Sequence, residues 1–232
     1  MIVLAIETAT RDGSVALARD GVVLASARGD GTRPHAARLP ADALALLEPH
    51  GLTLGDVAVF AVCLGPGAYT GLRVGIAAAQ GLAFATSRPI VGISALDALG
   101  AAALADRETS EVAGVWLDAA RGEVFAMRYA RSRHEVFGVT SIGDPIAAPP
   151  HDVTSTWAAD GPSVSRWIGD GVLRYRELIG AGKVSEPTPL LAPLVAQLAG
   201  VAAAAGHAGA PHALRPIYVR LSDVEMARQR QR

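Results

Sequence analysis

Lysine, cysteine and aromatic residues are scarce in this sequence. Lys183 is the single lysine among 21 basic residues, and the formal net charge of the 232 residues is −1. A chain without a basic excess is not expected to bind nucleic acid through a positively charged surface of its own. Its one cysteine, Cys63, has no partner for an internal disulfide, as is typical in a reducing cytosol. Because 50% of the residues are hydrophobic and only 5% are aromatic, the core is predicted to consist of alanine, valine and leucine.

Signals for secretion and for membrane insertion are lacking as well. The first residues, Met1 to Leu4, have no basic region and lead straight into a predicted strand. No uninterrupted apolar stretch reaches the roughly 20 residues that a membrane-spanning helix needs. We therefore predict a cytoplasmic protein without membrane contact, long enough for one large domain or two lobes.

The first half of the chain is predicted to form three strands, followed by alternating helices and strands. Asp12-Gly13 and Asp20-Gly21 supply turn chemistry between the first three strands. The order β-β-β-α-β-α-β-α is typical of a ribonuclease-H-like lobe, an α/β unit with a mixed five-stranded sheet and helices on both faces. The elements are predicted at residues 2–6, 14–18, 22–27, 35–48, 57–64, 76–85, 89–93 and 95–104.

A polar run at residues 106–111 is predicted to link this lobe to a second one. Strands over 112–117 and 123–129 repeat the design of the N-terminus. Prolines then divide the chain into short pieces, so the second lobe is predicted to be smaller and irregular. A Leu- and Ala-rich helix over about 189–205 is predicted to return to the first lobe, ahead of a flexible tail. The predicted lobes are residues 1–108 and 109–232.

The stretch from Gly65 to Gly75, GPGAYTGLRVG, is the most distinctive of the chain. It joins a predicted buried strand to a predicted helix, and its glycines allow a tight bend at the helix N-terminus. Thr70 is predicted to cap that helix. Backbone donors at such a bend can bind an anion, although a plain strand–helix turn explains the same glycines. The stretch lacks the Lys-Ser/Thr ending of a Walker loop and the spacing of a dinucleotide-binding loop.

This stretch resembles the GPGSFTGLRIG signature of the TsaB (YeaZ) family. Two further stretches resemble the family: DAARGEVF at Asp118–Phe125 is similar to D-A-R-x-G-E-V-Y, and LRPIYVR at Leu214–Arg220 is similar to L-x-P-x-Y-L-R. The resemblance implies the two-lobed ASKHA fold of actin, hexokinase and Hsp70, in which each ribonuclease-H-like lobe has a mixed sheet with flanking helices.

The resemblance also implies a function and partners. It indicates a non-catalytic subunit of the machinery that makes N6-threonylcarbamoyladenosine at position 37 of tRNAs reading ANN codons. Such a subunit binds and activates TsaD, with TsaE as a further member of the complex and tRNA as an indirect partner. Whether the isolated chain forms a homodimer stays open. For the basic tail, residues 220–232, both a solvated terminus and a contact with tRNA phosphates remain open.

The bend after the first strand is a candidate nucleotide or anion loop. By the resemblance, ASKHA proteins carry their first phosphate loop there, usually with an aspartate at the end of the first strand. A carboxylate with two threonine hydroxyls suits a hydrated Mg²⁺, but turns are rich in such residues without a ligand. No cofactor of its own is predicted, ATP and Mg²⁺ remain open through the complex, and an ATP-dependent ASKHA phosphotransferase is the alternative function. The residues of this candidate loop are Glu7, Thr8, Thr10, Gly65, Gly67 and Thr70.

Catalytic and metal-binding residues are not predicted. TsaD, the catalytic relative, carries an H-x-x-x-H metal pair after the strand that follows the signature helix, and Ala95 and Leu99 stand at those places here. The six histidines show no zinc spacing, and no G-x-S-x-G motif is present, so a peptidase is disfavoured.

Small residues recur along one side of the predicted signature helix. Gly71, Gly75 and Ala79 are spaced four residues apart, and glycine inside a helix costs about 0.5–1 kcal/mol relative to alanine. Such a stripe favours close approach of another helix, which can be the 35–48 helix of the same lobe. By the resemblance it can instead be TsaD. The predicted partner-binding residues are Leu39, Ala43, Gly71, Gly75, Ala78, Ala79 and Leu82.

Overall fold

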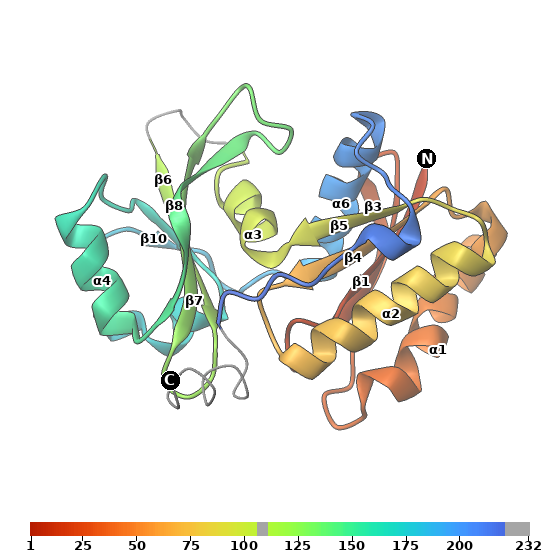
Figure 1. Ribbon diagram of the computed structural model, residues 1–232, viewed down its shortest axis with the longest axis horizontal. Coiled ribbons are helices and arrows are strands. Elements are labelled where there is room, and N and C mark those ends of the chain that lie inside the picture. Colours follow the sequence, from red (N-terminus) through yellow and green to blue (C-terminus); the bar gives the residue numbers. More distant parts are fainter. Residues whose placement is uncertain (106–110, 221–232) are drawn as a thin grey trace, which may run out of the picture.

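The computed structural model describes residues 1–105 and 111–220 and contains two five-stranded mixed sheets with helices around them (Figure 1). This confirms the predicted α/β architecture. The predicted boundary between residues 108 and 109 lies outside the described residues, as does the tail from 221 on. Within the described part of the chain, no helix has the length and apolar character needed to cross a membrane.

The first sheet has the order β3-β2-β1-β4-β5. Strand β2 pairs antiparallel with both β1 and β3, whereas β4 runs parallel to β1 and β5. Alternate residues of β1 face opposite sides: Val3 and Ala5 pack against α6, and Leu4 and Ile6 against α1 and α2. The elements are β1 (Ile2–Glu7), β2 (Ser14–Arg19), β3 (Val22–Arg28), α1 (His35–Leu47), β4 (Val59–Gly65), α2 (Tyr69–Ala85), β5 (Ile90–Ser94), α3 (Ala95–Ala103) and α6 (Leu191–Ala204), with short 3-10 turns at Glu48–His50 and Leu54–Asp56.

The second sheet has the order β10-β9-β6-β7-β8, and its outer strands β9 and β10 are very short. Three tryptophans, Trp116, Trp157 and Trp167, pack together on the side of the sheet that α4 covers. The elements are β6 (Val112–Asp118), β7 (Val124–Arg131), β8 (Val139–Ala148), α4 (Pro150–Ala159), β9 (Arg166–Ile168), α5 (Asp170–Arg174) and β10 (Lys183–Val184), with a 3-10 turn at Arg176–Leu178. A further 3-10 turn, Pro211–Ala213, follows α6 and contacts α2 of the first lobe.

A single hydrophobic cluster runs through both lobes. It joins the α6 side of the first sheet to residues such as Val115, Leu117 and Tyr129 of the second sheet, with α3 in between. Tyr129 of β7 donates a hydrogen bond of 2.6 Å to the Asp97 carboxylate of α3. The two sheets are therefore joined on one side by a continuous buried core.

The boundaries of the signature segment differ from those predicted. Helix α2 begins at Tyr69, well before the predicted residue 76, and its N-cap is Ala68. The prediction that Thr70 caps this helix is wrong, because Thr70 lies inside the first turn with an exposed side chain. Helix α1 continues through Pro40, which faces outward.

Candidate functional site

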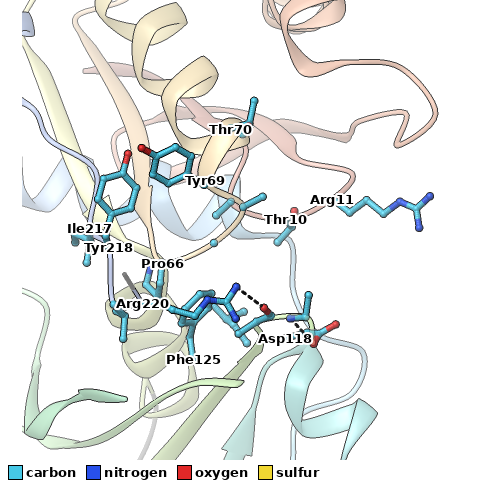
Figure 2. A pocket seen from close by; sticks show the side chains of 18 of the residues that line it. Thr10, Arg11, Pro66, Tyr69, Thr70, Asp118, Phe125, Ile217, Tyr218 and Arg220 are labelled. Carbon is cyan, nitrogen blue, oxygen red and sulfur yellow. Dashed lines mark hydrogen bonds between the residues drawn. The ribbon is translucent and has the colours of Figure 1, made fainter. Parts of the chain in front are cut away.

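A cavity of about 1320 Å³ lies between the two lobes (Figure 2). Its first-lobe wall is formed by the β1–β2 loop, the N-terminus of α1 and the loop that leads into α2. Its second-lobe wall is formed by the β6–β7 turn and Asp170 at the start of α5. Residues 217–220, near the C-terminal end of the described chain, complete the lining.

The glycines of the signature loop let it pack closely against neighbouring backbone. Gly65 has φ 101°, and a Cβ there would lie 3.0 Å from the carbonyl oxygen of Ile217. A Cβ on Gly67 would lie 2.5 Å from the carbonyl oxygen of Ala9, whose neighbour Thr10 also lines the cavity. Both glycines therefore place the loop where the two lobes and the C-terminal segment meet.

Glu7, at the end of β1, is turned into the protein. Its Oε1 accepts from the Thr10 backbone N–H at 2.6 Å, and its Oε2 accepts from the hydroxyls of Thr10 and Ser14. Ser14 Oγ in turn accepts from the backbone N–H of Ala192 in the first turn of α6. Burial raises the pKa of the Glu7 carboxyl, and these hydrogen bonds partly offset that effect.

The candidate nucleotide loop is therefore only partly at the cavity. Thr10, Gly67 and Thr70 line it, whereas Gly65 is buried. Both Glu7 and Thr8 are buried and bonded internally: Glu7 accepts three hydrogen bonds from Thr10 and Ser14, and the Thr8 hydroxyl donates to the Gly71 carbonyl oxygen at 2.8 Å. These two residues do not fit a hydrated Mg²⁺ in this arrangement, and nucleotide binding elsewhere in the cavity stays a prediction.

The small-residue stripe of α2 faces the interior of its own lobe. A Cβ on Gly71 would collide with the Thr8 carbonyl oxygen, and a Cβ on Gly75 would collide with the Thr8 side chain. Ala79 is fully buried, as are Leu39 and Ala43 of α1. These five residues, Leu39, Ala43, Gly71, Gly75 and Ala79, hold the two helices and the β1–β2 loop together, and their part in binding a partner stays a prediction. The other two predicted partner-binding residues, Ala78 and Leu82 of α2, are half-buried and pack against the core of the lobe.

Both helices nevertheless keep an exposed apolar side. Leu44 of α1 is 50% exposed and Phe84 of α2 is 80% exposed. Sequence reasoning missed both, although a signal was present, because Arg73 is the one charged residue among the 17 of α2. A surface helix ordinarily carries a polar outer face. We call the exposed set the outer face of α1 and α2; its members are Ala41, Leu44, Ala45, Ala77, Gly81 and Phe84.

The two positions that the family resemblance matched to a histidine pair are part of the core here. Ala95 and Leu99 lie on α3 and are fully buried among apolar residues. Among the residues that the structure describes, no group of three or more His, Cys, Asp or Glu side chains could hold a metal ion.

Comparisons with known proteins agree with this architecture. A family model described as TsaD, tRNA N6-adenosine threonylcarbamoyltransferase, matches residues 24–208. A Mycobacterium tuberculosis protein described as uncharacterized is 33% identical over 230 residues, which cover 96% of this chain and 93% of the relative. The tRNA threonylcarbamoyladenosine biosynthesis protein TsaB of Escherichia coli is 36% identical over 137 residues, which cover 59% of this chain and 58% of that protein. The solved structure of YeaZ from Pseudomonas aeruginosa matches with a TM-score of 0.75 at 31% identity, covering 94% of this chain and 99% of that chain.

Proposed function

The chain belongs to the family of TsaB (YeaZ) and TsaD proteins, and on this premise we propose that it is a non-catalytic subunit that binds and activates TsaD. It takes part in the biosynthesis of tRNA threonylcarbamoyladenosine, which is the process that the name of its Escherichia coli relative states. In the proposed complex TsaD transfers the threonylcarbamoyl group to adenosine 37 of tRNAs reading ANN codons. TsaE is a further member of the complex, and tRNA is reached through TsaD.

The observation that carries this proposal is the outer face of α1 and α2. Water-exposed Leu44 and Phe84 lie on two adjacent helices whose other exposed positions are mostly alanine. Contiguous exposed apolar surface on a soluble domain is typical of a protein–protein interface, and small residues allow a partner helix to approach closely. We therefore place TsaD on this face, in contact with residues that lie outside the buried stripe.

A substitution at Leu44 tests this placement. Leu44→Glu puts a charge into the proposed interface and is expected to weaken binding to the host's TsaD at least about tenfold. Leu173→Glu is the matched control, since Leu173 is 37% exposed and lies on α5 in the second lobe. Titration calorimetry with purified TsaD measures both affinities. If both variants bind TsaD as tightly as the parent chain does, TsaD does not bind this face. If Leu44→Glu changes only the self-association of the chain, the face binds a second copy of the chain instead.

The non-catalytic role is tested with the chain alone. The buried Ala95 and Leu99 offer no ligand at the positions of the TsaD metal pair, so no modified tRNA is expected from threonylcarbamoyl-adenylate unless TsaD is added. The alternative, an ATP-dependent phosphotransferase, is favoured by the cavity between the lobes. Steady ATP turnover by the purified chain would support that alternative, and modified tRNA made without TsaD would contradict the proposal.

A further inference from the structure

The C-terminal strap, residues 205–220, runs from the end of α6 along the first lobe and then toward the second lobe (Figure 1). Its residues 217–220 line the cavity. Gly209 forms an antiparallel bridge with Ile90 of β5, in which both N–H···O distances are 3.0 Å. Farther along, Gln80 of α2 donates to the Pro211 carbonyl oxygen at 2.7 Å. The first part of the strap is thus fastened to the first lobe.

The strap is also fastened to the first lobe at the edge of the cavity. The Ile217 N–H donates to the Leu64 carbonyl oxygen of β4 at 2.8 Å. The Tyr218 ring stacks on the Tyr69 ring of α2 with centroids 4.9 Å apart. Arg73 Nε donates to the Tyr218 hydroxyl at 2.9 Å. These contacts fix the position of Tyr218 on the N-terminal turn of α2.

Two residues later the strap contacts the second lobe. Arg220 Nη1 forms an ion pair with Glu123 Oε2 at 2.7 Å, and Nη2 donates to the Ala119 carbonyl oxygen at 3.1 Å. Both acceptors belong to the β6–β7 turn, and the guanidinium lies 5.8 Å from the Phe125 ring centroid. Figure 2 shows Arg220 reaching across to this wall from the strap that carries Tyr218.

The two lobes are therefore held together by different interactions on the two sides of their junction. On the α3 side the lobes share a buried apolar core, which excludes water. On the cavity side Arg220 and Glu123 hold them together, and these side chains are 26% and 30% exposed. An ion pair in contact with solvent is weakened by salt and exchanges readily, whereas buried apolar packing does not.

We propose that the strap is a clasp for the interlobe cavity: Arg220 holds the second lobe against the first, and release of the Arg220–Glu123 pair opens the cavity about the α3 core. The lobes keep their own folds in the open form, because neither core contains the pair. This device gives the LRPIYVR stretch a role, with Tyr218 as its anchor on α2 and Arg220 as its releasable end.

Distance measurement between the lobes tests the clasp in the isolated full-length chain, so the result does not depend on TsaD. Spin labels are placed on Glu48→Cys in the first lobe and Ser155→Cys in the second, two exposed positions, while native Cys63 is buried. Arg220→Ala and Glu123→Gln are each expected to add a longer distance and to raise the open-to-closed ratio about fivefold, equivalent to ~1 kcal/mol. Arg174→Ala, which removes the Arg174–Asp118 pair inside the second lobe, is the matched control and should change nothing.

Two further measurements separate the pair from general destabilisation. High salt should open the parent chain and leave Arg220→Ala unaffected, which tests the contact even if a variant folds poorly. The exchange Arg220→Glu with Glu123→Arg should restore the parent distribution. The proposal is overturned if the distances stay unchanged in both single variants and in salt, if Arg174→Ala opens the lobes equally, or if the exchanged pair stays open.

Discussion

Both carboxylate oxygens of Glu7 accept hydrogen bonds from the chain's own donors, and this residue sets the character of the β1–β2 bend. The Ser14 hydroxyl donates to Glu7 and accepts from the Ala192 N–H, so it connects the carboxylate to the N-terminus of α6. A helix N-terminus favours nearby negative charge, which is why a buried carboxylate is tolerated here. The residue type alone suggested a metal ligand, and only the fold reveals the three internal donors.

Glu7→Gln is expected to change how stability depends on pH. Burial raises the pKa of Glu7 in the folded chain above its ordinary value of 4.5, so its contribution is fully present below pH 4.5 and is lost as pH rises through the folded pKa. The neutral glutamine avoids this loss, so the variant should gain stability over the parent as pH rises toward neutrality. Urea denaturation at several pH values measures the difference. A constant difference across this range would show that Glu7 does not titrate differently on folding.

Ser14→Ala should act in the opposite direction. It removes a donor to Glu7 and leaves the Ala192 N–H without its acceptor, which costs about 1–3 kcal/mol for buried groups. The loss should be larger at neutral pH than at pH 4, because the bond to Glu7 favours the charged carboxylate. Urea denaturation at several pH values measures this loss of stability. An unchanged midpoint would mean that a water molecule replaces the Ser14 hydroxyl.

At the scale of the element, α2 shows why sequence spacing found a contact but not its partner. Gly71 and Gly75 mark a close approach, as predicted, and the group that approaches is Thr8, which is 63 residues from Gly71 in the chain. Nothing in the local pattern distinguishes this loop from a helix of another protein. The strands were easier to predict, since β1 and β4 are apolar runs bounded by turn residues.

Two glycines of α2 give a matched test of that packing. Gly75→Ala should destabilise the chain by about 1–3 kcal/mol, because its methyl group meets the Thr8 side chain in a full interior. Gly81→Ala should stabilise the chain by up to about 1 kcal/mol, because a Cβ there has no neighbour within 4 Å and alanine is the better helix former. Thermal unfolding, monitored by circular dichroism, compares the stability of both variants with that of the parent chain. Stabilisation by Gly75→Ala would show that α2 does not press against Thr8 in solution.

At the scale of the whole molecule, two lobes could be foreseen from the repeated strand–turn–strand design, but their joining could not. The shared core depends on which side of each sheet faces α3, and that is decided by packing between distant segments such as α6 and β1. The cavity has the same origin, because it is bounded by six segments that meet only in the folded chain.

The shared core predicts that the lobes unfold together. All three tryptophans lie in the second lobe, so tryptophan fluorescence reports on that lobe, whereas circular dichroism reports on both. Ile6→Val removes one methyl group from the first-lobe core beside α1 and α2 and should cost about 1 kcal/mol. In a cooperative molecule this first-lobe change lowers the urea midpoint seen by fluorescence as much as the midpoint seen by circular dichroism. If the fluorescence midpoint stays at the parent value, the lobes unfold separately, and the core around α3 does not couple them.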